Sequence, residues 1–281
     1  MSERSGSDPQ FVSFLSDYGV RDEFVGVCKG VIASIAPDAR VVDLVHELPA
    51  HDVAAGGLAL VRSVQYLPEG SLVLAVVDPG VGTARRLVAV VCAQATLFGP
   101  DNGLLAPAVA MLGGPRQVVE LSDPRFHLPS PGPTFAGRDI LAATLAHHAA
   151  GVAITDLGPA VDPAGLTPGL VGLPQIGPGG AIEAQVWWVD RFGNCQLNLG
   201  PDELEELGGS RDGRVEVRVG DLVRTARWVH TYADAKASEL VLVVDSYGLL
   251  ALALDRRSAA AELGLRTGAA VTLVPPDTAP S

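Results

Sequence analysis

The chain has 281 residues, 48% of them hydrophobic, which is enough to bury one large core or, more commonly, two domains. Its formal net charge of −12 argues against a nucleic-acid-binding protein, because there is no basic stripe to neutralise phosphates. No apolar run approaches the roughly 20 uncharged residues that span a bilayer. Residues 1–10 are polar and lack an apolar signal segment, so we expect a frayed tail and a cytoplasmic protein.

The cysteines predict no disulfide and no structural metal. Cys28, Cys92 and Cys195 are isolated in the sequence, without a CxxC pair and without a histidine at metal-ligand spacing. Each is expected to behave as a small buried apolar residue in a reducing compartment.

The first part of the chain alternates apolar runs of strand length with segments of helical spacing. We predict strands at residues 11–15, 41–45, 72–77, 87–92 and 118–121, and we expect 41–45 to be a second buried strand. We predict helices at residues 23–36, 53–64, 104–112 and 140–150, and a dense turn at 99–103. This alternation indicates an α/β domain with a largely parallel sheet over residues 11–165.

The second part of the chain has a different pattern. The sequence is rich in glycine and proline from residue 159 to 180, and we interpret residues 166–180 as a linker. From residue 181 to 281 we predict short strands at 182–189, 215–219, 222–228, 240–245, 249–254 and 270–274. Short strands at this spacing indicate a small β-barrel or a sandwich.

The stretch LVLAVVDPGVGTARR, residues 72–86, is the most informative in the chain. A buried strand stops at Asp78, because the next residue is a proline without a backbone donor and the glycines that follow free the backbone dihedrals. A carboxylate thus stands at the carboxyl end of a strand, where ligands of open α/β sheets bind, and Arg85 follows seven residues later. The alternative is a tight turn in which the acid caps its own backbone.

Further polar residues stand at predicted strand ends and turns. The candidates are Asp17, Asn102, Arg138, Asp139, Asp190 and Asn194. For Asp190 and Asn194 the alternative is simple turn chemistry. Tyr232 would more commonly be a packing residue, and Ser246 alone would be an ordinary hairpin residue. The glycines form neither a dinucleotide loop nor a P-loop, and no GxSxG elbow is present.

Six segments carry a resemblance that covers nearly the whole chain: FLSDYGVRDEFVGVCKGVI, VVDPGVGTARR, GPDNGLL, TFAGRDI, VDRFGN and DSYGLLALAL. In this order they resemble the S-adenosylmethionine hydroxide adenosyltransferase family, whose relatives include fluorinase and chlorinase enzymes. The resemblance implies an N-terminal α/β domain, a C-terminal all-β barrel, and a homotrimer with active sites between the first domain of one subunit and the second domain of its neighbour. It implies hydrolysis of S-adenosyl-L-methionine to adenosine and L-methionine, through attack of water or hydroxide on the ribose 5′ carbon, with no cofactor and no metal.

The resemblance also implies a role for each matching residue. Asp17 would bind both ribose hydroxyls, since one carboxylate can accept hydrogen bonds from a diol. Asp78 would orient the attacking water and accept its proton, while Arg85 would make that water more acidic. The remaining residues would surround the substrate: Asn102 in the wall of the first domain, Phe135 near the reacting carbon, Tyr232 on the adenine, and Asp190, Asn194 and Ser246 at the amino-acid end.

One position departs from the family pattern. The water-using enzymes carry histidine in the segment TFHGRD, where this chain has Ala136. The halogenases tend to carry tyrosine there, and they also replace the equivalent of Asp78. The chain therefore keeps the acid and the arginine of the hydrolases without their imidazole, so we expect it to bind S-adenosyl-L-methionine but to turn it over slowly. The alternatives are a halide-using transferase that forms 5′-haloadenosine and a catalytically weak protein that binds S-adenosyl-L-methionine or adenosine.

Overall fold

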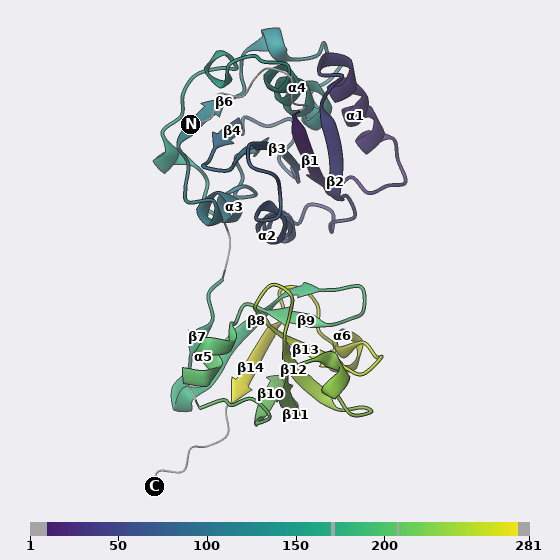
Figure 1. The fold of residues 1–281 in the computed structure, drawn as a ribbon, viewed down its shortest axis with the longest axis vertical. Coiled ribbons are helices and arrows are strands. Elements are labelled where there is room, and N and C mark those ends of the chain that lie inside the picture. The colour runs from purple at the N-terminus through teal and green to yellow at the C-terminus, as the bar shows by residue number, and fades with distance from the viewer. Residues whose placement is uncertain (1–9, 170–171, 207, 275–281) are drawn as a thin grey trace. The chain divides into compact units, whose positions relative to one another are not determined.

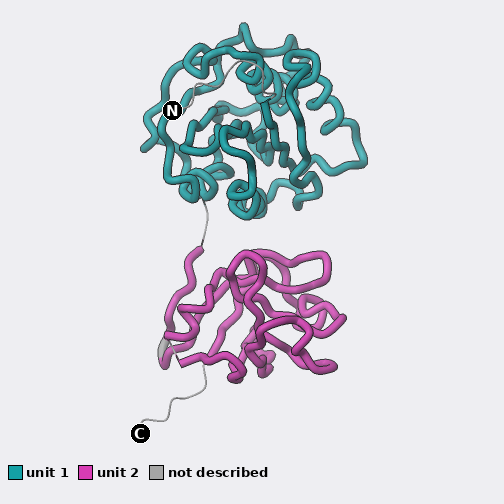
Figure 2. Tube along the Cα trace, in the orientation of Figure 1, with its two compact units in different colours: residues 1–171 teal, residues 172–281 magenta. Residues whose placement is uncertain are grey.

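The computed structural model describes residues 10–169, 172–206 and 208–274. The chain divides into two compact units, residues 1–171 and residues 172–281 (Figure 2). The predicted tail, residues 1–10, lies outside the described residues except for Gln10.

The described residues of the first unit form a six-stranded mixed sheet with strand order β2-β1-β3-β5-β4-β6. Its strands are β1 (Phe11–Ser16), β2 (Arg40–Val45), β3 (Ser71–Val76), β4 (Leu87–Val91), β5 (Ala95–Pro100) and β6 (Gln117–Glu120). The pairs from β2 to β5 are parallel, and β4 pairs with β5 and β6 in antiparallel fashion. The predicted α/β domain with a largely parallel sheet is confirmed.

Helices cover both faces of this sheet (Figure 1). They are α1 (Phe24–Ile35), α2 (Val53–Val64), α3 (Ala106–Met111), the π-helical turn η2 (Gly137–Ala142) and α4 (Ala143–Ala149), with short 3₁₀ turns η1 (Pro124–Phe126), η3 (Ile154–Asp156) and η4 (Pro163–Gly165). Helix α1 packs with α4, and α2 packs with α3. Successive residues of a strand face opposite sides of a sheet, so Val76 meets Gly137 of η2 while Val77 meets Gly56 of α2.

Two predictions for this unit are wrong. Strand β2 was expected to be buried, but it is the edge strand with β1 as its neighbour, and Val42 is 38% exposed. Gly99 and Pro100 were expected in a turn, but they end β5, a strand that the sequence patterns missed. Pro100 is the last residue of the strand and lies beyond the pairing of β5 with β3, which ends at Phe98.

The described residues of the second unit form a closed β-barrel of seven strands. The barrel strands are β8 (Ile182–Val189), β9 (Cys195–Leu197), β10 (Arg214–Val219), β11 (Leu222–Val229), β12 (Leu240–Val244), β13 (Leu250–Leu254) and β14 (Ala270–Val274). A further short strand, β7 (Gln175–Ile176), pairs with β8. The order is β14-β10-β11-β12-β13-β9-β8, and pairing of β14 with β8 closes the barrel. This closure selects the barrel over the sandwich.

The barrel is filled by apolar side chains around the fully buried Trp228. Helices α5 (Pro201–Glu206) and α6 (Ala259–Leu263) and the 3₁₀ turns η5 (Pro178–Gly180) and η6 (Tyr232–Asp234) complete the unit. The hydrophobic pattern of the sequence did not predict β9, because this strand has three residues and is too short to show alternation of apolar and polar residues.

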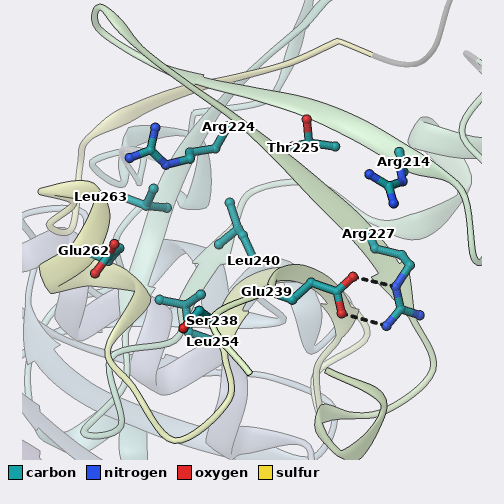
Figure 3. Close-up of a pocket in the computed structure, with 10 residues that line it drawn as sticks. All are labelled: Arg214, Arg224, Thr225, Arg227, Ser238, Glu239, Leu240, Leu254, Glu262 and Leu263. Carbon is teal, nitrogen blue, oxygen red and sulfur yellow. Dashed lines mark hydrogen bonds and ion pairs between the residues drawn. The ribbon is translucent and has the colours of Figure 1, made fainter. Parts of the chain in front are cut away.

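A cavity of about 190 Å³ lies beside β11 and β12, which pair over Arg227–Val229 (Figure 3). Leu240, Leu254 and Leu263 line it, and Arg227 donates to both carboxylate oxygens of Glu239 at 2.9 and 2.8 Å. This ion pair lowers the pKa of Glu239 to about 2. None of the predicted site residues lines this cavity.

The space around two glycines predicts that their substitution by alanine has opposite effects on stability. A Cβ on Gly99 would lie 2.7 Å from the Ala75 carbonyl oxygen and 3.0 Å from the Leu105 side chain, so Gly99→Ala should destabilise the protein by about 1–3 kcal/mol. A Cβ on Gly30, in α1, meets nothing within 4 Å, so Gly30→Ala should stabilise it by about 0.5–1 kcal/mol. Thermal unfolding of both variants tests this, and equal shifts would contradict it.

Candidate functional site

The carboxyl end of β3 presents a buried ion pair. Arg85 donates through Nε to both carboxylate oxygens of Asp78, at 2.7 and 2.9 Å, and its terminal amino group also contacts the carboxylate. The side chains of Asp78 and Arg85 are 6% and 14% exposed. Gly80 leaves room for this pair, because a Cβ there would lie 3.0 Å from Arg85 Cδ. The carboxylate is therefore held by the guanidinium, whereas the alternative from sequence was a cap of its own backbone.

The carboxyl end of β1 lies beside that of β3. The backbone N–H of Asp17 donates to the Val76 carbonyl at 3.3 Å, and one Asp17 carboxylate oxygen accepts the N–H of His51 at 2.8 Å. His51 has a positive φ of 66°, a backbone conformation that costs energy for a residue with a Cβ. The second carboxylate oxygen of Asp17 meets no hydrogen-bond donor among the described residues.

The start of η2 packs onto both strand ends. A Cβ on Gly137 would collide with the Tyr18 hydroxyl and lie 3.2 Å from Val76, so only glycine allows this approach. Ala136, one residue earlier, is 7% exposed and belongs to the core of the unit. Three segments distant in sequence thus meet around Asp17, Asp78 and Ala136.

An open cavity of about 540 Å³ adjoins these segments, lined by Tyr18, Phe24, Pro131, Gly132, Thr134, Phe135 and Arg138. Phe135 packs edge-on against Tyr18 and Phe24, with ring centroids 5.7 and 5.3 Å apart. The guanidinium of Arg138 lies 4.7 Å from the Phe135 ring centroid and pairs with Asp139. Phe135 therefore forms part of an aromatic wall, which suits a planar or apolar ligand surface.

Two buried groups beside this corner, the Tyr18 phenol and the Cys28 thiol, have raised pKa values. Burial raises the pKa of the Tyr18 phenol above its ordinary value, and the nearby Cys28, Asp17 and Asp78 raise it further. Burial also raises the pKa of the Cys28 thiol to about 12. At neutral pH neither group supplies an anionic nucleophile.

Asn102 joins the end of β3 to the loop that follows β5. Its Nδ2 donates to the Val77 carbonyl at 2.9 Å, and its Oδ1 accepts the Leu104 N–H at 3.1 Å. Both ends of the amide are thus used to hold the wall of the site together.

In the second unit, Asp190 closes a turn after β8. Its carboxylate accepts the N–H groups of Phe192 and Asn194 at 2.9 Å each, and also the Asn194 side-chain amide at 2.8 Å. Gly193 has a φ of +83° and packs directly against Ser258. The turn chemistry that was the alternative from sequence is therefore present, and it uses the Asn194 side-chain amide nitrogen.

A second turn of the same kind lies after β12. Asp245 accepts the N–H groups of Tyr247 and Leu249 at 2.8 and 3.2 Å and contacts the Gln196 amide, and the next residue, Ser246, is exposed. Sequence reasoning did not select Asp245. The repeated spacing of an acid three residues before a glycine, DRFG and DSYG, is the signal that could have found it.

Tyr232 lies near both turns. It begins η6, is 48% exposed, and sits beside the cap that Thr231 and Asp234 form. Burial raises the pKa of Tyr232, and Asp190 and Asp245 raise it further, so the three residues are within electrostatic reach. The predicted residues of each unit are thus clustered, and their roles in binding or catalysis stay predictions.

The described residues contain no group of histidine, cysteine and acidic side chains that could hold a metal ion. Cys28, Cys92 and Cys195 are free thiols, and their expected burial is observed. Within the described ranges, helices are too short or too polar to cross a membrane.

Both units match family models. Residues 12–158 match the SAM hydroxide adenosyltransferase N-terminal domain, and residues 184–272 match the SAM hydroxide adenosyltransferase C-terminal domain. The chain belongs to the SAM hydroxide adenosyltransferase family.

Similar proteins agree with this assignment. An (R)-S-adenosyl-L-methionine hydrolase of Salinispora tropica is 42% identical over 92% of this chain and 95% of its own length. A fluorinase of an Actinoplanes species is 29% identical over 93% of this chain and 96% of its own length. The crystal structure of an uncharacterized conserved protein from Thermotoga maritima has a TM-score of 0.87 and 29% identity, and covers 94% of this chain and 99% of its own.

The buried ion pair predicts a specific loss of stability. Arg85→Met leaves the Asp78 carboxylate buried without its cation and should destabilise the protein by about 3–5 kcal/mol. Adding Asp78→Leu removes the stranded charge and should recover part of that loss.

Arg125→Met is the matched control, since the Arg125–Asp123 pair is exposed and should contribute little. Denaturant unfolding of the four proteins measures the effects. Equal losses for Arg85→Met and Arg125→Met, or no recovery in the double variant, would contradict the account.

Proposed function

We propose that this protein hydrolyses S-adenosyl-L-methionine to adenosine and L-methionine. Support comes from the curated relatives named (R)-S-adenosyl-L-methionine hydrolase at 41–42% identity over more than 90% of the chain. The observation that carries the proposal is the buried Asp78–Arg85 pair at the carboxyl end of β3.

The sulfonium is already a good leaving group, so the main requirement of the reaction is a correctly positioned water. The oxygen of water or hydroxide forms a bond to the ribose 5′ carbon while the carbon–sulfur bond breaks. The electron pair of the carbon–sulfur bond goes to sulfur, so the sulfonium leaves as the neutral thioether of methionine. When water is the nucleophile, it must also lose a proton. A buried site that aligns the water opposite the carbon–sulfur bond supplies most of what is required.

In this proposal Asp78 holds the attacking water and accepts its proton. The contacts with Arg85 fix the carboxylate plane and use both acceptor sites of Oδ2, so one lone pair of Oδ1 is left for a water. Arg85 places positive charge beside the forming hydroxide. The acidic corner also favours a cationic substrate.

The other residues would hold the substrate. Asp17 would accept both ribose hydroxyls, Phe135 would lie near the reacting carbon, and Asn102 would support the wall through its bonds to Val77 and Leu104. In the second unit Tyr232 would stack on the adenine, and Asp190, Asn194 and Ser246 would receive the amino-acid end. Because Asp190 already accepts three hydrogen bonds, it would act chiefly by orienting Asn194.

We also propose a homotrimer in which the first unit of one subunit and the second unit of its neighbour complete each site. The support for this arrangement is the resemblance of the motifs. The free, buried cysteines agree with a cytoplasmic location, and the protein would act without a metal or another cofactor.

The reaction is tested by incubating the protein with S-adenosyl-L-methionine in ¹⁸O-labelled water and separating the products. We expect methionine and adenosine whose 5′ oxygen carries the label. Formation of 5′-haloadenosine in chloride or fluoride buffer would instead show a halide-using transferase. Tight calorimetric binding without product after long incubation would show a binding protein.

The missing imidazole predicts a slow reaction. Ala136 offers no proton-accepting group at the start of η2, and general acid–base assistance is typically worth ~100- to 10,000-fold. Ala136→His should therefore raise the rate of adenosine release by at least about 100-fold, with Ala136→Phe as a size control that should not. No acceleration by histidine would contradict this explanation.

The shared site predicts complementation between two inactive variants. Asp78→Asn damages the first unit and Asn194→Ala the second, so mixed trimers would contain some sites with neither change. Co-refolding the two variants should restore part of the activity, and sedimentation should give about three times the 29.0 kDa of one chain. A monomer, or no recovery in a mixed trimer, would contradict the arrangement.

A further inference from the structure

A buried histidine stands next to the strand end that carries Asp17. His46 follows β2, is 6% exposed, and lies edge-on against the buried Phe14 with ring centroids 4.6 Å apart. Its Nδ1 is 2.7 Å from the Ser16 hydroxyl, and its Nε2 is 3.0 Å from Oδ1 of Asp43. Both ring nitrogens therefore have polar neighbours, although none of the roles proposed above uses His46.

The contacts continue outward to the surface. The second carboxylate oxygen of Asp43 accepts from Lys29 Nζ at 2.6 Å, and Asp43 and Lys29 are both partly exposed. Partial burial tends to raise the pKa of Asp43, but the interactions with Lys29 and His46 outweigh it and hold the pKa below its ordinary value. Asp43 thus places a carboxylate 3.0 Å from Nε2 of His46, although the geometry between them is not that of a hydrogen bond.

The contacts inward hold the turn that contains Asp17. Ser16 Oγ accepts the N–H of Tyr18 at 3.3 Å, and the backbone carbonyl of His46 accepts the N–H of Gly19 at 2.6 Å. His46 therefore binds the turn on both sides of Asp17, through its ring on one side and its carbonyl on the other. No other side chain among the described residues is hydrogen-bonded to the Ser16 hydroxyl.

The hydrogen bond between Ser16 and His46 holds in either direction. The Ser16 oxygen accepts from Tyr18, and its hydroxyl can either donate to Nδ1 or accept from it. Nε2 lies 3.0 Å from the Asp43 carboxylate. Ser16 is fully buried, so this serine–histidine–aspartate set cannot present a nucleophile to a substrate.

We propose that His46 is a positioning residue, which orients the Asp17 carboxylate toward a ribose diol by holding Ser16. This inference rests on the function proposed above, since it takes Asp17 as the ribose-binding group. Loss of the imidazole contact would let the turn from Ser16 to Gly19 shift. A carboxylate that shifts loses the second of two hydrogen bonds to a diol before it loses general affinity for the nucleoside.

The test is discrimination between adenosine and 2′-deoxyadenosine, measured by calorimetry on the full chain. The wild type should bind adenosine about 10- to 100-fold more tightly, because a hydrogen bond to a carboxylate is lost in the deoxy compound. In His46→Phe, which keeps ring volume, and in Ser16→Ala, the ratio should fall toward one. His46→Asn places an amide, which can accept from Ser16 or donate to it, near the position of Nδ1, and should retain most of the discrimination.

Thr144→Val is the matched control, because Thr144 is also fully buried and donates a hydrogen bond to the Ile140 carbonyl at 2.7 Å. It should lower the melting temperature without changing the ratio. An unchanged ratio in folded Ser16→Ala would overturn the inference alone, whether or not His46→Phe folds. A wild-type ratio near one would overturn both the inference and the ribose-binding role of Asp17.

Discussion

The buried pair of Asp78 and Arg85 is the interaction on which the candidate site depends. A carboxylate that is 6% exposed is costly to bury unless a cation and hydrogen-bond donors surround it. Arg85 satisfies this condition because the loop from Gly80 to Gly82 turns back toward the strand end. The contacts that stabilise the pair also fix the orientation of the Asp78 carboxylate at the end of β3.

The surrounding elements are arranged so that other chain segments can approach this pair closely. Gly137 allows η2 to contact Tyr18 and Val76, and Gly56 allows α2 to pack against Val77 and Leu104. Asn102 then ties Val77 to the loop after β5. The result is a rigid corner built from sequence-distant pieces, which suits a reaction that depends on alignment of a water rather than on a strong nucleophile.

Both units have acidic residues at turns that follow buried strands. In each of these turns a glycine two or three residues after the acid reverses the chain. Asp78 is held by a side chain, whereas Asp190 and Asp245 are held by backbone N–H groups of their own turns. Asp78 is paired with a cationic side chain that could also stabilise a forming hydroxide, which is why it is the stronger candidate for a base.

Much of the fold can be predicted from the sequence, because the periodic spacing of apolar residues indicates which face of a helix or strand is buried. The α2 helix was predicted with its observed bounds, and the barrel strands were predicted within a residue or two except for β9. The exposure of β2 was missed, although Asp43 lies within the strand and a charge inside a strand is typical of an edge position.

Site residues could be predicted where a sequence motif contains them. Contacts between residues that are distant in the sequence could not be predicted. Asp17, Asp78 and Arg85 were selected from strand ends, but the pairing of Asp78 with Arg85 was not assigned from spacing. The hydrogen bond from His51 to Asp17 and the contacts of His46 join residues about 30 positions apart, and no local pattern reports them. Propensity is local, whereas these contacts are set by how parallel strands align.

The most direct test of the central claim is a crystal structure of the protein grown with adenosine and methionine. We expect the ribose hydroxyls on Asp17, the 5′ carbon facing Asp78 and Arg85, and the methionine beside Asn194 of a neighbouring subunit. A nucleoside bound far from Asp78 and Arg85, or enclosed by one subunit without Asn194 or Asp190, would contradict the account.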